Sequence, residues 1–225
     1  MQANAWVERV SRLKTVHRID AEHFQPAFDE LEERLTARSS TKRLGEIASY
    51  VRRGVQPRYV PGGPVLVINS QHVGKYLLNV DGAERTDDEF WEATPRARAK
   101  QYDVLMNSTG LGSIGRVNCV LHDAKTVVDN HVSIIRAKKG ECDPLYLSVY
   151  LNSRFGRMQT EKWLSGSSGQ LEIYPDDIKR FIVLLPDQDF QATIRKAVLE
   201  AHKKYTTAMS AVHDTQRAVE SLIDK

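Results

Sequence analysis

The 225-residue sequence lacks the features that define membrane, secreted and metal-binding proteins. No run approaches the ~18 apolar residues of a membrane span, and the N-terminus has no signal-peptide core. The two cysteines, Cys119 and Cys142, form no C-x-x-C pair, so neither a disulfide framework nor a zinc site is expected. The seven histidines lack the i, i+4 pairing of a metal-binding helix. We expect a cytoplasmic protein with reduced, buried thiols and no metal site.

Motifs for nucleotide and nucleophile chemistry are also missing. There is no Gly-Lys-Ser/Thr phosphate loop, and no Ser-His-Asp arrangement can be assigned from spacing. Pro175-Asp176 and Pro186-Asp187 are not followed by the acid-x-Lys of a nuclease. Asp143-Pro-Leu-Tyr146 approaches an amino-methyltransferase motif, but Leu145 replaces its second proline. We interpret Pro144 as a helix start with Tyr146 in the core, and expect a chain without catalytic activity.

Gly110, Gly112 and Gly115 match the dinucleotide-binding pattern G-x-G-x-x-G. Such a loop binds pyrophosphate where a strand precedes it and a helix follows. Residues 103–106 fit a short strand, but residues 116–121 alternate with a period near two, as a strand does. The glycines therefore predict a tight hairpin loop that needs positive φ, with no bound nucleotide.

The hydrophobic content of 41% and charged content of 27% are those of an ordinary globular protein. We expect a helix beginning at Pro26 and ending near Ser39-Ser40, and another from Pro144 through Met158 or beyond. Buried strands are expected at residues 65–68, 130–136 and 180–185, and residues 81–99 are expected to form an irregular surface segment. Short strands with few helices between them favour an α+β, strand-rich domain over a regular βαβ repeat.

The C-terminal residues 187–225 follow a different pattern. Apolar and small residues are spaced alternately four and three apart, at Ile194, Val198, Ala201, Tyr205, Ala208, Val212, Thr215, Val219 and Leu222. This repeat predicts a long helix whose seam faces a partner helix in a coiled coil, either in a second copy or in another protein. We therefore divide the chain into a lead-in with a helix (1–40), a globular domain (41–186) and the C-terminal helix (187–225).

A net charge of +3 permits an anionic partner, and the distribution of charge is more informative than its sum. Residues 42–58 hold five cations, Lys42, Arg43, Arg52, Arg53 and Arg58, against one acid, Glu46. Arginine and lysine neutralise phosphates, while Gln, Asn and Arg form bidentate contacts to base edges. Taken singly, each such residue is more often an ordinary solvated surface residue.

Polar strings at strand ends extend this set, because loops at strand ends present side chains to a ligand. The residues predicted to face DNA are Arg52, Arg53, Gln56, Arg58, Tyr59, Asn69, Gln71, His72, Asn107, Ser108, Thr109 and Arg116, with Ser168 of the Gly-Ser loop 165–170 as a further candidate. Two other interpretations stay open: a fragment of a DNA methyltransferase, and a protein-interaction adaptor whose coiled coil is its main binding element.

In order along the chain, these segments resemble the target recognition domain of type I restriction–modification specificity subunits. The matching segments are Leu44–Ile47 with Gly54–Pro57, Val65–Asn69 with Gln71–Val73, Asp103–Gly110 with Gly115-Arg116, His131–Arg136, Leu151–Ser153, Gly166–Gln170 and Phe181–Pro186, followed by the long helix. Residues 18–24 and the helix after them resemble a lead-in seen in some members.

The resemblance implies a domain that reads half of a bipartite double-stranded DNA target, and a helix that spaces two such domains. It also implies partners: a modification subunit, which binds S-adenosylmethionine and docks on the helix, and a restriction and translocation subunit. No cofactor is expected in this chain. A full specificity subunit carries two recognition domains and two spacer helices, whereas one of each is found here. The sequence is therefore expected to be a half-subunit that pairs as a homodimer, or a portion of a longer protein.

Overall fold

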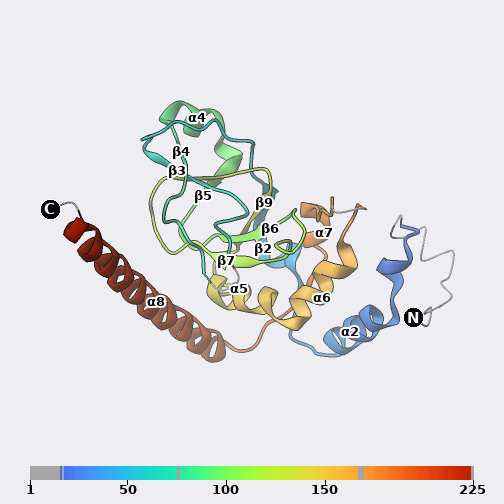
Figure 1. Ribbon diagram of the computed structural model, residues 1–225. Coiled ribbons are helices and arrows are strands. Elements are labelled where there is room, and N and C mark those ends of the chain that lie inside the picture. The colour runs from blue at the N-terminus through green and yellow to red at the C-terminus, as the bar shows by residue number, and fades with distance from the viewer. Residues whose placement is uncertain (1–15, 17, 75–76, 167–169, 224–225) are drawn as a thin grey trace, which may run out of the picture. The chain divides into compact units, whose positions relative to one another are not determined.

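The computed structural model describes residues 16, 18–74, 77–166 and 170–223 (Figure 1). The chain divides into two units, Met1–Pro186 and Asp187–Lys225. Short strands and helices make up the first unit, and one long helix makes up the second. The predicted α+β class is confirmed.

A four-stranded antiparallel sheet, in the order β2-β9-β6-β7, forms the centre of the first unit. Its strands are β2 (Ala48–Arg53), β9 (Val132–Ala137), β6 (Val104–Asn107) and β7 (Val117–Cys119). Valine, isoleucine and leucine are frequent in β6 and β9, as expected for buried strands. Since β6 and β7 pair as an antiparallel hairpin, the glycine-rich loop joins two strands, as its sequence predicted. Gly110, Gly112 and Gly115 all have positive φ, which explains why glycine occupies these positions.

A second four-stranded sheet has the order β4-β3-β8-β5, with β3 and β8 parallel and the other pairs antiparallel. Its strands are β4 (Arg85–Thr86), β3 (Val65–Ile68), β8 (Thr126–Val128) and β5 (Arg98–Ala99). The prediction that residues 81–99 are irregular was wrong, because they contain β4, helix α4 (Asp88–Ala93), the 3-10 turn η2 (Pro95–Ala97) and β5. Most of these residues are exposed or half-buried, as expected for a surface segment. Strands of two residues carry no periodic signal and exist only through their pairing partners.

The two sheets pack face to face around one apolar layer. Ile68, Ala99 and Val128 of the second sheet and Leu105, Val132 and Ile134 of the first belong to the same buried cluster. Because side chains alternate along a strand, the remaining residues of β6 turn to the opposite face, where α5 (Pro144–Asn152) contacts β6 and β7. On the other side, Phe90 and Trp91 of α4 pack on Val65 and Val67. Figure 1 shows α4 and α5 on opposite sides of the two sheets.

The remaining helices surround a two-stranded sheet of β1 (Thr41–Arg43) and β10 (Ile182–Leu184). Leu31 and Leu35 of α2 pack against Ile182, beside side chains of α6. The other elements are η1 (Ala21–Phe24), α2 (Pro26–Thr36), α3 (Leu44–Ile47), α6 (Arg154–Trp163) and α7 (Pro175–Ile178).

Two predicted helix boundaries need correction. The helix from Pro26 ends at Thr36, before the predicted Ser39-Ser40. The helix from Pro144 stops at Asn152, because Ser153 adopts an extended backbone and separates α5 from α6. Asp143 caps α5 by accepting hydrogen bonds from the backbone N–H groups of Leu145 and Tyr146, at 2.8 and 3.1 Å. Pro144 therefore starts a helix, and Tyr146 is buried in the core, as expected.

Within the first unit, polar and aromatic contacts attach the lead-in to the end of α6. The His23 ring lies edge-on to Trp163, with 4.6 Å between centroids, and its Nδ1 lies 2.7 Å from the Lys162 carbonyl oxygen. Burial lowers the pKa of His23, so the neutral ring is favoured.

Both cysteines are buried, as expected, and form no disulfide in the part of the chain that the structure describes.

An ion pair between Asp103 and Arg136 joins the start of β6 to β9 within the first sheet, and Arg136 also reaches the second sheet. The Arg136 Nε and Nη2 atoms donate to the two oxygens of Asp103 at 2.7 and 2.6 Å, and Nη2 lies 3.4 Å from the Arg98 carbonyl of β5. Asp103 is buried and also accepts from the backbone N–H of Lys100 at 2.7 Å. The hydrogen bonds that Arg136 donates to Asp103 raise the pKa of Arg136, which favours its charged form.

The second unit is helix α8 (Gln188–Ile223), 36 residues without a break. At 1.5 Å per residue it is about 54 Å long. The prediction of one long C-terminal helix is confirmed. No helix among the described residues is long and apolar enough to cross a membrane.

We expect Asp103→Asn to lower the free energy of unfolding by about 3 kcal/mol, because it leaves the Arg136 guanidinium partly buried without its counter-charge. Chemical denaturation measures the change. The control is Asp176→Asn, which removes an exposed ion pair with Lys179 and should change stability by less than about 0.5 kcal/mol. Equal effects of the two substitutions would contradict a special role for the buried pair.

Candidate nucleic-acid interface

Several loops meet at one end of the first sheet. Because its strands are antiparallel, β2 and β6 end where β9 and β7 begin, at the same end of the sheet. Backbone hydrogen bonds connect them: Gly54 N–H donates to the Val132 carbonyl at 3.0 Å, and Ser108 N–H donates to the His131 carbonyl at 2.8 Å. We call this region, with residues 54–59, 69–74, 108–116, 129–131 and 170–173, the loop end.

Two of these segments reach the loop end through non-local contacts. The Asn107 side-chain amide donates to the Ser70 carbonyl at 2.9 Å, which attaches residues 69–74. Glu172 forms isolated bridges with Thr109 and Ser165, and Ile173 N–H donates to the Ser108 carbonyl at 2.9 Å. Polar segments that lie apart in the sequence are therefore brought together at the loop end.

The structure corrects the predicted roles of Asn107 and Ser108. Both side chains are 0% exposed, so they cannot reach a base edge in this conformation. The Ser108 hydroxyl shares a 2.6 Å hydrogen bond with Ser133, and Asn107 holds residues 69–74 as described. These two residues position the loops and do not contact a base, because their polar side chains are buried at a strand end and hydrogen-bond within the fold.

Arg53, which was predicted to face DNA, has partners within the fold. Its guanidinium donates to the Glu172 carboxylate at 3.1 Å and to the Ile173 carbonyl at 2.9 Å, and lies 5.0 Å from the centre of the Tyr174 ring. The side chain therefore ties β2 to the segment after the Gly-Ser loop. A half-buried guanidinium with these partners serves to hold the loop end together.

Arg58 is exposed but already has two anionic neighbours. Its guanidinium lies 2.5 Å from the Asp87 carboxylate and 2.9 Å from that of Glu89, both at the start of α4. Exposed pairs of this kind are weak and screened by salt. The pair fixes the loop from β2 against α4 and reduces the net positive charge that this loop presents.

The other predicted residues keep accessible polar groups. Arg52, Gln56, Tyr59 and Gln71 are exposed, and Asn69, His72, Thr109 and Arg116 are half-buried. Ser168 lies outside the described residues.

Local hydrogen bonds orient several of these side chains. The Asn69 side-chain oxygen accepts from the Gln71 N–H at 2.9 Å, and the Asn69 N–H donates to His72 Nδ1 at 3.0 Å. Burial lowers the pKa of His72. Its neutral ring can then carry a proton on Nε2 as a donor. Arg116 folds back on the glycine-rich loop, donating to the Gly112 carbonyl at 2.8 Å.

Sequence reasoning missed two members of the loop end, His131 and Asp129, and one residue that contacts it, Glu84. His131 is exposed and shares a 2.7 Å hydrogen bond with the Thr109 hydroxyl. Glu84 accepts from the Asn69 amide at 3.2 Å, and Asp129, whose pKa burial raises, accepts from the His131 N–H at 2.9 Å. Their one sequence signal was the Asp129-Asn-His131 turn directly before a strand.

The seam residues of α8 are accessible along most of its length. Ala201, Tyr205, Ala208, Val212, Val219 and Leu222 are exposed, whereas Ile194 and Val198 are half-buried. The exposed fraction rises from 41% at Tyr205 to 73% at Leu222. An apolar stripe of this length on one helix needs a partner surface to be removed from water.

Within the described residues, no three His, Cys, Asp or Glu side chains are placed to hold a metal ion. The absence of a metal site in the whole chain stays a prediction.

The fold is similar to solved structures of restriction–modification proteins. A chain of a type I restriction–modification system is 16% identical, with a TM-score of 0.51 over 94% of this chain and 53% of that one. The S subunit of a type I system from M. genitalium is 12% identical, with a TM-score of 0.51 over 75% of this chain and 40% of that one. The type IIG restriction endonuclease BpuSI is 12% identical, with a TM-score of 0.57 over 86% of this chain and 30% of that one.

We expect Gly54→Ala to destabilise the loop end. An added Cβ would lie 1.8 Å from the Val128 carbonyl oxygen and 2.4 Å from that of Asp129, so the backbone must move. A loss of about 2 kcal/mol in the free energy of unfolding follows. Gln56→Ala, at an exposed position in the same loop, is the control and should leave stability unchanged. A Gly54→Ala variant as stable as the wild type would show that this close approach is not required.

No family model matches the sequence, and no curated protein matches it. The chain spans about half the length of the first structure above and less of the other two. Within that length it has the fold of the specificity subunits of type I restriction–modification systems.

Proposed function

We propose that this chain is a non-catalytic, sequence-specific DNA-recognition protein, acting as all or part of the specificity subunit of a type I restriction–modification system. The observation that carries the proposal is the loop end, where loops distant in sequence present exposed and half-buried polar side chains from one rigid two-sheet scaffold. The likeness to an S subunit supports it. Rigid presentation suits base readout, because a misplaced donor loses its partner on the base.

The loop end carries the side-chain types that distinguish base pairs. Gln56 and Gln71 are exposed, and glutamine amides pair with the N6 and N7 atoms of adenine. The exposed Glu84 carboxylate can accept from cytosine N4. Tyr59, Asn69, His72 and Thr109 add further hydrogen-bonding groups at the same edge. These residues would read the sequence, while cations hold the duplex through its phosphates.

Helix α8 would carry the subunit contacts. Its exposed seam suits pairing with another helix, either in a second copy of the chain or in a modification subunit. Two copies related by a twofold axis would read a palindromic bipartite target, each copy taking one half-site. In this proposal the modification subunit binds S-adenosylmethionine and transfers the methyl group, and the restriction and translocation subunit completes the complex.

A second candidate is the recognition portion of a larger restriction enzyme, because BpuSI gives the highest TM-score of the three structures while this chain covers 30% of it. Binding of tritiated S-adenosylmethionine by the isolated chain tests whether the chain is instead a methyltransferase fragment. We expect none, and saturable binding would favour a methyltransferase fragment. A mobility shift against random duplex pools, with modification subunit added, separates DNA recognition from a protein-binding adaptor.

We expect Gln56→Ala and Gln71→Ala to relax sequence preference while leaving most affinity for random duplex unchanged. Each substitution removes an amide able to discriminate a base by about 1–3 kcal/mol. Selection from a random duplex pool, followed by sequencing, measures the preference. The control is Gln25→Ala, outside the loop end, which should leave the selected sequence unaltered. Wild-type selections from both loop-end variants would remove these loops from the reading surface.

We expect Val212→Asp and Val219→Asp together to weaken self-association through α8, because they place four carboxylates in the seam of a paired dimer. Sedimentation equilibrium compares the variant with the wild type. Ser210→Asp adds a carboxylate away from the seam and is the control for charge. A wild-type chain that sediments as a monomer, with or without the modification subunit, would contradict the homodimer proposal.

A further inference from the structure

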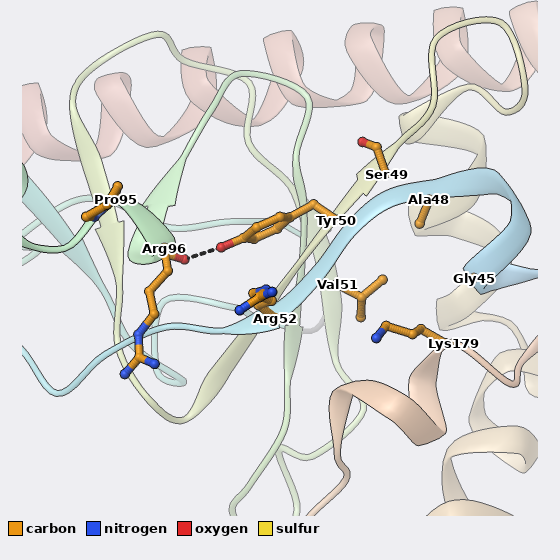
Figure 2. Close-up of a pocket in the computed structure, with 9 residues that line it drawn as sticks. All are labelled: Gly45, Ala48, Ser49, Tyr50, Val51, Arg52, Pro95, Arg96 and Lys179. Carbon is orange, nitrogen blue, oxygen red and sulfur yellow. Dashed lines mark hydrogen bonds between the residues drawn. The ribbon is translucent and has the colours of Figure 1, made fainter.

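A pocket of about 460 Å³ lies at the junction between the two sheets, apart from the groups already assigned to base reading. Its walls come from β2, from the turn η2 and from the residue after α7 (Figure 2). Since β2 is the outermost strand of its sheet, this edge is not covered by another strand. The lining residues are Gly45, Ala48, Ser49, Tyr50, Val51, Arg52, Pro95, Arg96 and Lys179.

The lining of the pocket is cationic. It includes Arg52, Arg96 and Lys179 and no carboxylate. Arg52 and Arg96 are exposed, and neither forms an ion pair with the residues that the structure describes. Lys179 has an exposed partner, Asp176, at 2.8 Å, and such pairs exchange readily with other anions. Two guanidinium groups therefore lack a counter-charge within one pocket.

Tyr50 contacts the backbone of Arg96 and the side chain of Arg52. Its hydroxyl donates to the Arg96 carbonyl at 2.7 Å, which ties η2 to β2. The Arg52 guanidinium lies 5.9 Å from the centre of the Tyr50 ring, and Figure 2 shows it beside that ring. The nearby Arg136 is also 5.2 Å from this ring, but its charge is already matched by Asp103.

Neighbouring residues of β2 contact the pocket and the loop end. Consecutive residues of a strand point to opposite faces, so Arg52 and Arg53 project in opposite directions. Arg53 donates hydrogen bonds to Glu172 and Ile173, whereas Arg52 lines the pocket. An anion in the pocket would therefore have a fixed position relative to the loops.

We propose that this pocket binds a phosphodiester group of the DNA backbone through the guanidinium groups of Arg52 and Arg96, and so sets the register of the duplex without reading its sequence. This inference rests on the proposed function. Planar guanidinium groups bind phosphate oxygens in a bidentate manner, and two of them without carboxylate neighbours favour a phosphate over a neutral ligand. Lys179 supplies a third donor once it leaves Asp176.

The test is the salt dependence of duplex binding by the full chain. We expect Arg52→Gln and Arg96→Gln each to weaken binding equally to preferred and random duplexes. Each should reduce the slope of log K against log salt by about one, and the double variant by about two. Arg52→Lys and Arg96→Lys keep the charge and should retain most of the slope. Arg38→Gln is the control, because it makes the same change in net charge at an exposed site after α2.

Thermal unfolding is measured on each variant, and the exposed positions of Arg52 and Arg96 predict folded proteins. An unchanged slope in the double variant, or the same loss in Arg38→Gln, would overturn the phosphate assignment while leaving the proposed function intact. A shifted sequence preference would assign the arginines to bases and also overturn it. Inorganic phosphate that shifts the amide resonances of Ser49 to Arg52, with duplex binding unaffected by the variants, would assign the pocket to a free anion instead. A wild-type chain that binds no duplex even with the modification subunit added would contradict the proposed function itself.

Discussion

Arg136 joins the two sheets by a polar contact at one end of their apolar layer, and its ion pair with Asp103 holds the guanidinium in place. Asp103 is buried, and its carboxylate has no solvent to stabilise it, so its charge requires the guanidinium of Arg136. Arg136 lies on β9 of the first sheet and also reaches the carbonyl of Arg98 in the second. Because Tyr50 makes a parallel link to Arg96, the inter-sheet junction is held by polar contacts at one end of an otherwise apolar layer.

Fixing the two sheets against each other also fixes the loops that leave them. Residues 69–74 follow β3 of the second sheet, whereas residues 108–116 and 129–131 adjoin strands of the first. These loops therefore lie together at the loop end only while the two sheets keep one relative position. The buried amide of Asn107 strengthens this coupling, since it leaves the first sheet and binds the carbonyl of Ser70. Side chains that could read a base are thus supported by polar residues that cannot.

The cations of this chain divide into groups with different physical roles. Arg53 and Arg136 are partly buried and bind carboxylates and carbonyl groups inside the fold. Arg58 is exposed but paired with two acids of α4. Arg52 and Arg96 have no such partners among the residues that the structure describes, and both line one pocket. Local density of positive charge is therefore a poor measure of phosphate binding, because it counts structural and available cations alike.

The sequence by itself determined the elements with a strong periodic or local signal: the long helix α8, the strands around Val65–Ile68 and Val104–Asn107, and the hairpin at the glycine-rich loop. Hydrophobic periodicity and positive-φ glycines are local properties, so they can be recognised without partners. Only the tertiary structure decided the two-residue strands β4 and β5, the burial of Asn107 and Ser108, and which arginines are paired. Each depends on residues distant in the chain, and no local pattern encodes which distant carboxylate or carbonyl a side chain will meet.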